Sequence, residues 1–268
     1  MIFRRSKAKA EGAAGRGDGN GSAASASSAG DFADTEAIHA EITRLMDQNR
    51  ITPDREPERR LLRLRHIAGI RHLNEAKGDA SYPEPDAAAL PDGRLPDIAP
   101  EELTPELVRA GILRDGAVLV RGAVTPEASQ SLADGIEQAF KDRTAFNEGA
   151  RSDDLLYEEF VPEPGFAQMS ERAWIEAGGG VLAADSPRLV FEMLDAFERI
   201  GLTEVIAGYL GEPAAVSAEK CTLRKADPSV GGAWHQDGNF MGDVRALNVW
   251  LSLSRCGDVA PGRDIVPR

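Results

Sequence analysis

The period of the apolar pattern changes near Pro213, and this change limits the possible folds more than any other feature of the sequence. Before Pro213, apolar residues recur every three to four positions in several stretches, which is typical of amphipathic helices. After it, residues 215–226 (AVSAEKCTLRKA) are moderately strand-like, and residues 246–254 (ALNVWLSLS) alternate strictly. One face of this predicted strand holds Leu247, Val249, Leu251 and Leu253, and the other holds Asn248, Trp250 and Ser252. Helices followed by strands predict an α+β domain with a sheet or barrel core.

Two helical patterns lie within residues 34–78 and predict a helical hairpin. The first has Thr35 as its candidate N-cap, and its stripe is formed by Ile38, Ile42, Leu45, Met46 and Asn49. The second follows the proline-containing turn ITPDREPE, and its stripe is formed by Leu61, Leu64, Ile67, Ala68 and His72. Arginines crowd the other face of this second helix, which favours a solvated face.

The rest of the chain divides into three parts by composition. Residues 1–33 are rich in Gly, Ala and Ser and have almost nothing to bury, which predicts a disordered arm. Residues 79–100 carry many prolines and predict a linker. Residues 101–268 form the predicted main domain. Its expected elements are a short helix, a strand at 117–121, a helix that starts at Thr125 and Pro126, an irregular stretch at 151–186, and one or two helices that end at Gly211.

Charge and composition exclude several classes of partner. The 268 residues carry a formal net charge of −13, which repels nucleic acids and anionic membrane surfaces, so we expect neither as a partner. The sequence has no stretch of 18 or more apolar residues and no secretory apolar core near its start, which favours a cytoplasmic protein. Cys221 and Cys256 lack the spacing of a redox or zinc motif and are expected to be reduced, buried thiols.

The segment WHQDGN, residues 234–239, carries the clearest chemical signal. On an extended chain, side chains two positions apart point to the same side, so His235 and Asp237 can reach one point together. An imidazole and a carboxylate are two of the three ligands in the facial triad that holds Fe(II) in oxygenases. A surface turn with a local His–Asp hydrogen bond is the alternative. A hydrolase in which Asp237 orients His235 as a base is disfavoured, because no Ser has the G-x-S-x-G context.

Three segments in order resemble the phytanoyl-CoA dioxygenase-like family: GILRDGAVLVRGAVTPEASQSLADGIEQAF, IAGYLGEPAAV, and GAWHQDGNF followed by LNVWLSLSRC. They span about residues 105–268. The resemblance implies an iron(II)- and 2-oxoglutarate-dependent dioxygenase that hydroxylates a small-molecule substrate, with Fe(II) as cofactor and 2-oxoglutarate as co-substrate. It also implies a double-stranded β-helix (jelly-roll) core with flanking helices. His235 and Asp237 match the family's first two metal ligands.

The sequence departs from the family pattern after Asp237. The four histidines are His39, His66, His72 and His235, so the family's distal His, and with it the Arg that pairs with 2-oxoglutarate, has no counterpart. We therefore expect a jelly-roll that is incomplete at the C-terminus, in a truncated or fragmentary chain. His66 and His72 are expected to be satisfied or exposed rather than substitute ligands. The alternative function is a non-catalytic fragment or binding module that self-associates through the helical hairpin.

Six further residues are candidates for binding the co-substrate. Lys220, Thr222 and Arg224 lie on the strand-like stretch before the His235–Asp237 segment, where a cation or hydroxyl can bind a carboxylate. Solvated surface charge is the simpler interpretation of Lys220 and Arg224. Asn248, Trp250 and Ser252 share the strand face that is expected to line the cavity, although Trp250 suits a core position equally well.

Overall fold

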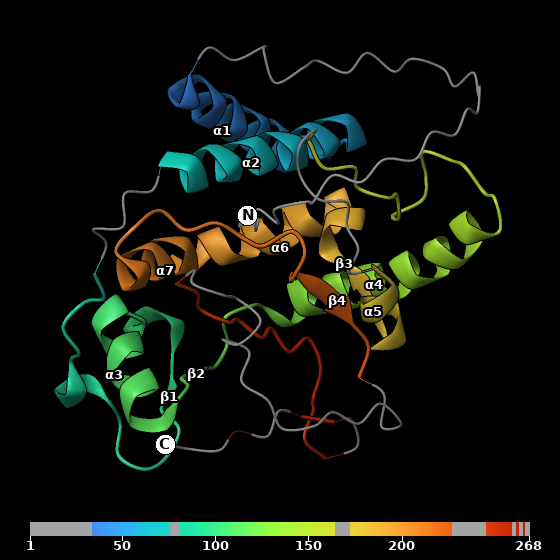
Figure 1. The fold of residues 1–268 in the computed structure, drawn as a ribbon. Coiled ribbons are helices and arrows are strands. Elements are labelled where there is room, and N and C mark those ends of the chain that lie inside the picture. Colours follow the sequence, from blue (N-terminus) through green and yellow to red (C-terminus); the bar gives the residue numbers. More distant parts are fainter. Residues whose placement is uncertain are drawn as a thin grey trace, which may run out of the picture.

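The computed structural model describes residues 34–75, 81–163, 172–226, 245–258, 261, 262 and 265. This part of the chain is 54% helix and 5% strand. Helix α6 (Pro187–Arg199) runs through the middle of the molecule, and the pair α1 (Thr35–Ile51) and α2 (Arg55–Glu75) lies on one side of it (Figure 1). Helix α4 (Pro126–Asn147) packs against α6 from the other side. The predicted arm, residues 1–33, lies outside the described residues.

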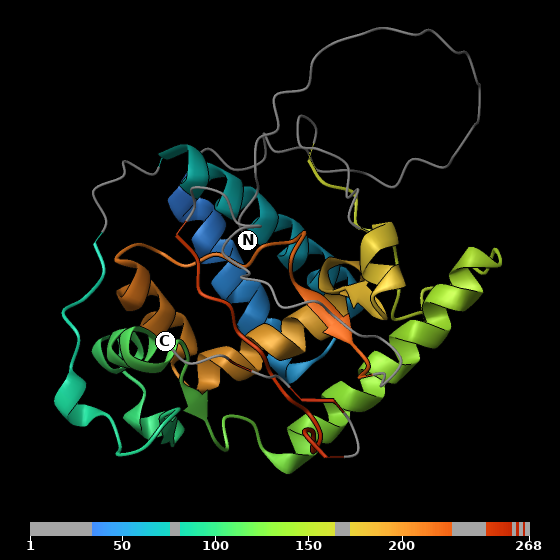
Figure 2. The same ribbon diagram turned by 60° about the horizontal axis from the view of Figure 1, so that its bottom comes forward.

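The remaining helices are short. They are α3 (Pro105–Asp115), α5 (Arg172–Ala177), α7 (Leu202–Leu210) and the 3₁₀ turns η1 (Ala87–Ala89), η2 (Pro100–Glu102) and η3 (Ala183–Asp185). Figure 2 shows α3 beside α7 at one end of the molecule and α4 extending toward the other end. Within the described ranges, no helix is both long enough and apolar enough to cross a membrane.

The prediction of an α+β fold with a jelly-roll core is wrong. The described residues form two sheets of two strands each. Strand β1 (Asp97–Ile98) pairs in parallel with β2 (Leu119–Val120), and β3 (Gly180–Leu182) pairs antiparallel with β4 (Thr222–Arg224). These strands of two or three residues are far shorter than the strands of a jelly-roll core, which wraps two sheets around a shared interior.

The alternating segment 246–254 shows why the prediction failed. It is described throughout and contains neither helix nor strand. Leu247 packs on the apolar residues of α3 and α7, whereas Val249 is 41% exposed and Trp250 is 51% exposed. Alternation produces a strand only where a neighbouring backbone supplies hydrogen bonds, and no strand of the described residues lies against this segment. The strand-like stretch 215–226 is likewise reduced to the three residues of β4.

The helical hairpin follows from local signals. The buried residues of α1 are Ile38, Leu45, Met46 and Asn49, all from the predicted stripe. The N-cap is Asp34 rather than Thr35, because the Asp34 carboxylate accepts a hydrogen bond from the Ala37 N–H at 2.7 Å. Asn49 closes the turn between the helices: its Oδ1 accepts from the Asp54 N–H at 2.8 Å, and its amide nitrogen donates to Glu58 at 3.2 Å.

Caps at the other helices also match the sequence signals. Thr125 accepts from the Ala128 N–H at 3.2 Å at the start of α4, with Pro126 as the first helical residue. Helix α7 ends at Gly211, which adopts the left-handed conformation with φ of 71°. The prediction of one or two helices that end at Gly211 is therefore confirmed as α6 and α7.

The apolar core consists of three clusters. The body cluster joins α4, α6, β3 and β4 and contains Leu62, Ala139, Ile175, Leu182, Ala183, Ala184, Leu189, Val190, Ala218 and Leu223. The end cluster lies around α3 and α7 and contains Leu90, Ile98, Leu103, Leu107, Val108, Ala110, Tyr209 and Leu210. The hairpin cluster contains Ile38, Leu45, Met46, Leu61, Leu64, Ile67 and Phe191. Helix α6 contributes to both the body and the hairpin clusters. Two residues of the predicted linker, Leu90 and Ile98, are buried in the end cluster.

Candidate functional site

The two predicted metal ligands, His235 and Asp237, lie in residues 227–244, outside the described residues. Their roles stay predictions. The structure does describe the chain on both sides of this interval. Strand β4 and the two residues after it lead into the interval, and Arg245 begins the segment that follows it.

Strand β4 is held against β3 at the surface of the body cluster. Val181 pairs with Leu223 in register, and Leu223 is 7% exposed, so the strand is anchored by its central residue. Thr222 and Arg224 flank Leu223 and lie on the same side of the strand, because side chains two positions apart share a face. The Arg224 Nε donates to the Thr222 hydroxyl at 3.1 Å. The structure therefore brings these two candidates together directly before the interval that holds His235 and Asp237.

An exposed indole borders the same strand. Trp174 on α5 is 62% exposed, and the Arg224 guanidinium carbon lies 5.9 Å from the centroid of its ring. Lys220, by contrast, is exposed in the turn before β4, where its backbone N–H donates to the Ser217 hydroxyl at 3.2 Å. Thr222 and Arg224 thus form one polar face with Trp174 as a neighbour, whereas Lys220 belongs to the adjoining turn.

The candidates after the interval do not share a strand face. Asn248, Trp250 and Ser252 are all exposed, and their segment is irregular. The Ser252 hydroxyl donates to the Ser254 carbonyl at 2.7 Å and lies 3.3 Å from the Cys256 thiol. The core position considered for Trp250 is not observed. A role for these three residues in co-substrate binding stays a prediction without a common cavity face to support it.

Arg245 is the first described residue after the interval, and it is anchored at the end of α7. Its guanidinium pairs with Glu212 at 3.2 Å and lies 5.4 Å from the centroid of Tyr82. Tyr82 in turn packs on Tyr209, with ring centroids 5.1 Å apart. The chain therefore leaves for the His235–Asp237 segment from the body cluster and returns at the end cluster.

The described histidines do not assemble a metal centre. Among the residues that the structure describes, no group of three His, Cys, Asp or Glu side chains is arranged to hold a metal ion. His66 is fully buried, and its Nε2 accepts a hydrogen bond from the Glu163 N–H at 3.1 Å. Burial, assisted by the charge of Arg63, lowers the pKa of His66 to about 4, so the ring is neutral near pH 7. His66 is therefore a buried histidine that accepts a hydrogen bond at Nε2, in line with a structural rather than a metal-binding role.

Asp185 is a buried acid that no local pattern in the sequence marks. It is 1% exposed, and Arg172 binds it with two nitrogens, Nε to Oδ2 at 2.9 Å and Nη2 to Oδ1 at 2.7 Å. Asp185 also accepts from the Phe160 N–H at 2.8 Å. Burial raises the pKa of Asp185, while the contacts with Arg172 and Phe160 oppose that rise. Its partners are two parts of the chain, so Asp185 acts as a structural anchor.

The two cysteines have different surroundings. Both are free. The Cys221 sulfur contacts the Met193 sulfur at 4.0 Å, and burial raises the pKa of this thiol to about 11. Cys221 is partly buried and Cys256 is exposed, so the expectation of two buried thiols is wrong for Cys256 and met only in part by Cys221.

Comparison with known proteins adds no relative: no family model matches the chain, and no curated protein or solved structure is significantly similar to it.

Proposed function

We propose that this chain binds Fe(II) through His235 and Asp237 and belongs functionally to the iron(II)- and 2-oxoglutarate-dependent oxygenases that act on small molecules. The observation that carries the proposal is the His-x-Asp spacing, preceded and followed by segments that resemble the phytanoyl-CoA dioxygenase-like family. One imidazole nitrogen and one carboxylate form a donor set that suits Fe(II). When bound, such an iron supplies the oxidising chemistry for hydroxylation, with 2-oxoglutarate as co-substrate.

Two candidate residues that precede the interval 227–244 in the chain support this proposal. Arg224 and Thr222 lie on one face of β4, and the chain reaches His235 within eleven residues of Arg224. A guanidinium next to a hydroxyl suits a carboxylate ligand. Because the acidic chain repels anionic surfaces and nucleic acids, a small molecule in the cytoplasm is the proposed substrate.

The direct test is anaerobic equilibrium dialysis of the full chain against Fe(II). The wild-type protein is expected to bind one iron, and His235→Ala is expected to weaken binding at least about tenfold because one of the proposed ligands is lost. His39→Ala is the matched control, since His39 is exposed on α1 and should leave iron affinity unchanged.

A second measurement separates binding from catalysis. Succinate formation from 2-oxoglutarate is expected only with Fe(II), O₂ and an intact His235. If the wild-type protein binds Fe(II) no better than His235→Ala, the iron site does not exist. Iron binding without any succinate formation would instead reject the oxygenase and leave a metal-binding protein.

A non-catalytic binding module is the second candidate, favoured by the hairpin. The α1–α2 pair has its own apolar cluster, and Ile51 at the end of α1 is 84% exposed. We propose self-association through this end of the hairpin as the alternative. Sedimentation velocity of the full chain should then show a concentration-dependent oligomer that Ile51→Lys abolishes; a monomer at all concentrations would reject this candidate.

A further inference from the structure

The α1–α2 hairpin holds most of its apolar surface within itself. Six of the seven members of the hairpin cluster come from α1 and α2, and only Phe191 comes from the rest of the molecule. In the other direction, Leu62 is the one fully buried residue of the hairpin that joins the body cluster, with Ile70 packed at its edge. The apolar residues that cross between the hairpin and the body are therefore few, and they are joined by an edge contact between the rings of His66 and Phe160, whose centroids lie 5.2 Å apart.

Charged contacts also join the hairpin to the body. At the end of α1, the Arg50 guanidinium pairs with Asp195 at 2.6 Å and with Glu198 at 3.0 Å, both on α6. Near the start of α2, the buried carboxylate of Glu58 pairs with Arg188, also on α6. These pairs join the hairpin to α6 at both ends of the inter-helix turn.

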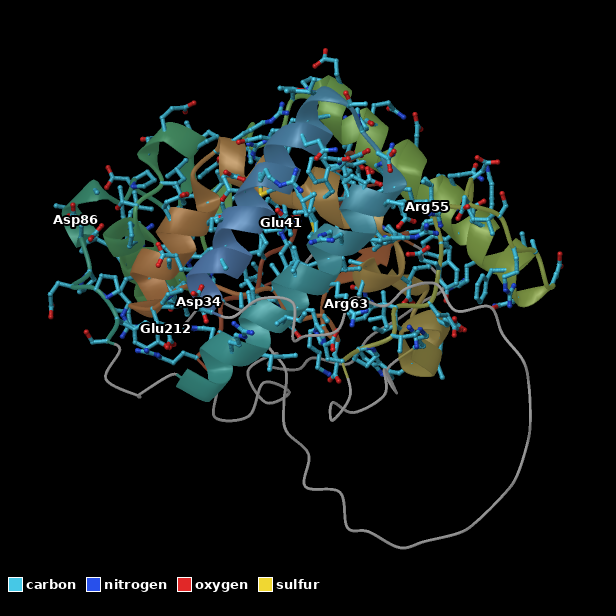
Figure 3. All side chains as sticks on the ribbon, turned by 90° about the horizontal axis from the view of Figure 1, so that it is seen from above. Asp34, Glu41, Arg55, Arg63, Asp86 and Glu212 are labelled. Carbon is cyan, nitrogen blue, oxygen red and sulfur yellow. The ribbon has the colours of Figure 1, made fainter. Side chains whose placement is uncertain are left out.

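A row of arginines on α2 makes the second set of charged contacts. Arg55, Arg59 and Arg63 are spaced four residues apart and therefore lie along one face of the helix. Figure 3 labels Arg55 and Arg63 on this helix. They bind the acidic segment, defined here as residues 153–163. Arg55 and Arg59 pair with Glu158 at 3.0 and 2.7 Å. Arg63 pairs with Glu163 at 2.9 Å.

Arg55 of this row, and His66 of the same helix, also bind the backbone of the acidic segment. Arg55 donates to the carbonyls of Asp153 and Leu155, and the Glu163 N–H donates to His66 of α2. The segment itself stays attached to the body, because Tyr157 is 2% exposed and the Leu156 N–H donates to Asp142 of α4 at 2.6 Å. The arginine row therefore forms a contact between two units that are each anchored elsewhere.

Burial of one arginine on α2, Arg65, is unfavourable when the hairpin is docked. The Arg65 Nη1 is buried without a hydrogen-bond partner among the described residues. Burial lowers the pKa of Arg65 to about 10, although Glu198 and Asp195 lie close enough to oppose the shift. Exposure to water would satisfy this guanidinium, so docking has an opposing contribution at the same interface.

We propose that the α1–α2 hairpin is a detachable cover, which undocks from α6 and the acidic segment as an intact helical pair when its ion pairs are weakened. The hairpin cluster keeps the two helices together after undocking. Because only a few apolar residues, among them Leu62 and Phe191, cross this boundary, the charged pairs control the docked population. Undocking exposes the arginine row in an otherwise acidic molecule and uncovers the Phe191 side of α6.

Thiol labelling of the full chain tests this directly, in a Cys256→Ser background that removes the exposed native thiol. Leu62→Cys places a thiol where the hairpin meets the body, and Leu64→Cys places one inside the hairpin cluster. Raising NaCl from about 0.1 M to about 1 M shortens the Debye length from about 10 Å to about 3 Å. The labelling rate of Leu62→Cys is expected to rise about tenfold, whereas that of Leu64→Cys stays constant, because screening acts on the charged interface.

Two results would overturn the proposal. Equal acceleration at both positions would mean that salt unfolds the hairpin, and constant rates at both would mean that the ion pairs do not control docking. If Leu62→Cys does not fold, small-angle scattering of the wild-type chain decides the question. The radius of gyration must then increase between the two salt concentrations at unchanged far-ultraviolet circular dichroism, and an unchanged radius rejects undocking.

Discussion

At the scale of single residues, the buried ring of His66 links folding to pH. Its Nε2 accepts from the Glu163 N–H, and a protonated imidazole has no lone pair for this contact. The pKa is lowered from 6.5 to about 4 in the folded chain. A depressed histidine pKa stabilises the folded state above the unfolded pKa, and this stabilisation is lost as pH falls from 6.5 toward 4.

The size of this effect on the folding free energy follows from the difference between the two pKa values of His66. Protonation of His66 removes about 3 kcal/mol of folding free energy between pH 6.5 and pH 4, at about 1.4 kcal/mol for each pH unit. Urea unfolding at several pH values checks this. His66→Gln keeps an acceptor near the Glu163 N–H but cannot titrate, so its unfolding free energy should fall less steeply in this range. His39→Gln should retain the wild-type slope, and equal slopes in all three proteins would contradict the prediction.

The residues that the sequence identified differ from those that the structure shows to be buried and polar. Thr222 and Arg224 could be grouped because they are two positions apart on a strand. Asp185 could not, since its partners Phe160 and Arg172 are 25 and 13 residues away and nothing local marks them as a pair. The Arg row of α2 was interpreted as a solvated face for the same reason: the acids that it binds lie about a hundred residues further along the chain.

At the scale of elements, helix ends were predictable because their signals are local. The Thr125–Pro126 start of α4 and the Gly211 end of α7 depend on neighbouring residues only. The stripe that begins at Ile38 was predictable because a helix buries one face wherever it packs. The extent of strands was less predictable because pairing is non-local. The strand predicted at 117–121 is confirmed only for Leu119–Val120 (β2), and the segment that contains Val249 and Trp250 alternates, yet the described residues give it no neighbouring strand.

The glycine at the end of α7, Gly211, allows a test of how backbone strain and steric overlap each affect stability at a helix end. Gly211 has φ of 71°, and a Cβ at this position would overlap the Ser81 carbonyl. Gly116 ends α3 with φ of 84°, but a Cβ there meets nothing within 4 Å. Gly116→Ala should therefore lower the unfolding free energy by about 1 kcal/mol, from backbone strain alone. Gly211→Ala should lower it by about 3 kcal/mol, because strain and overlap add.

Chemical denaturation of the two glycine variants separates these contributions. The expected result is a larger shift of the urea midpoint for Gly211→Ala than for Gly116→Ala, with unchanged slopes. Equal shifts would mean that the chain near Ser81 moves away from the new methyl group at little cost in free energy.

At the scale of the whole molecule, two of the three apolar clusters, the body cluster and the hairpin cluster, share helix α6, but not equally. Leu189 and Val190 place α6 within the body cluster, whereas Phe191 alone represents it in the hairpin cluster. The body should consequently unfold as one cooperative unit with α6, and the hairpin should be able to lose its order separately. Local unfolding of this kind is expected where few buried apolar contacts cross a boundary.

Two matched substitutions distinguish a molecule with separable parts from one that unfolds as a single unit. Leu64 is 3% exposed in the hairpin cluster and Leu189 is 1% exposed in the body cluster, so each change to alanine should cost about 2–5 kcal/mol locally. Hydrogen exchange should accelerate in α1 and α2 for Leu64→Ala while α4 and α7 remain protected. Leu189→Ala should accelerate exchange in α4 and α6 together. If Leu64→Ala accelerates exchange equally in α4 and α7, the clusters form one cooperative unit, and an intact hairpin cannot leave the body without unfolding it.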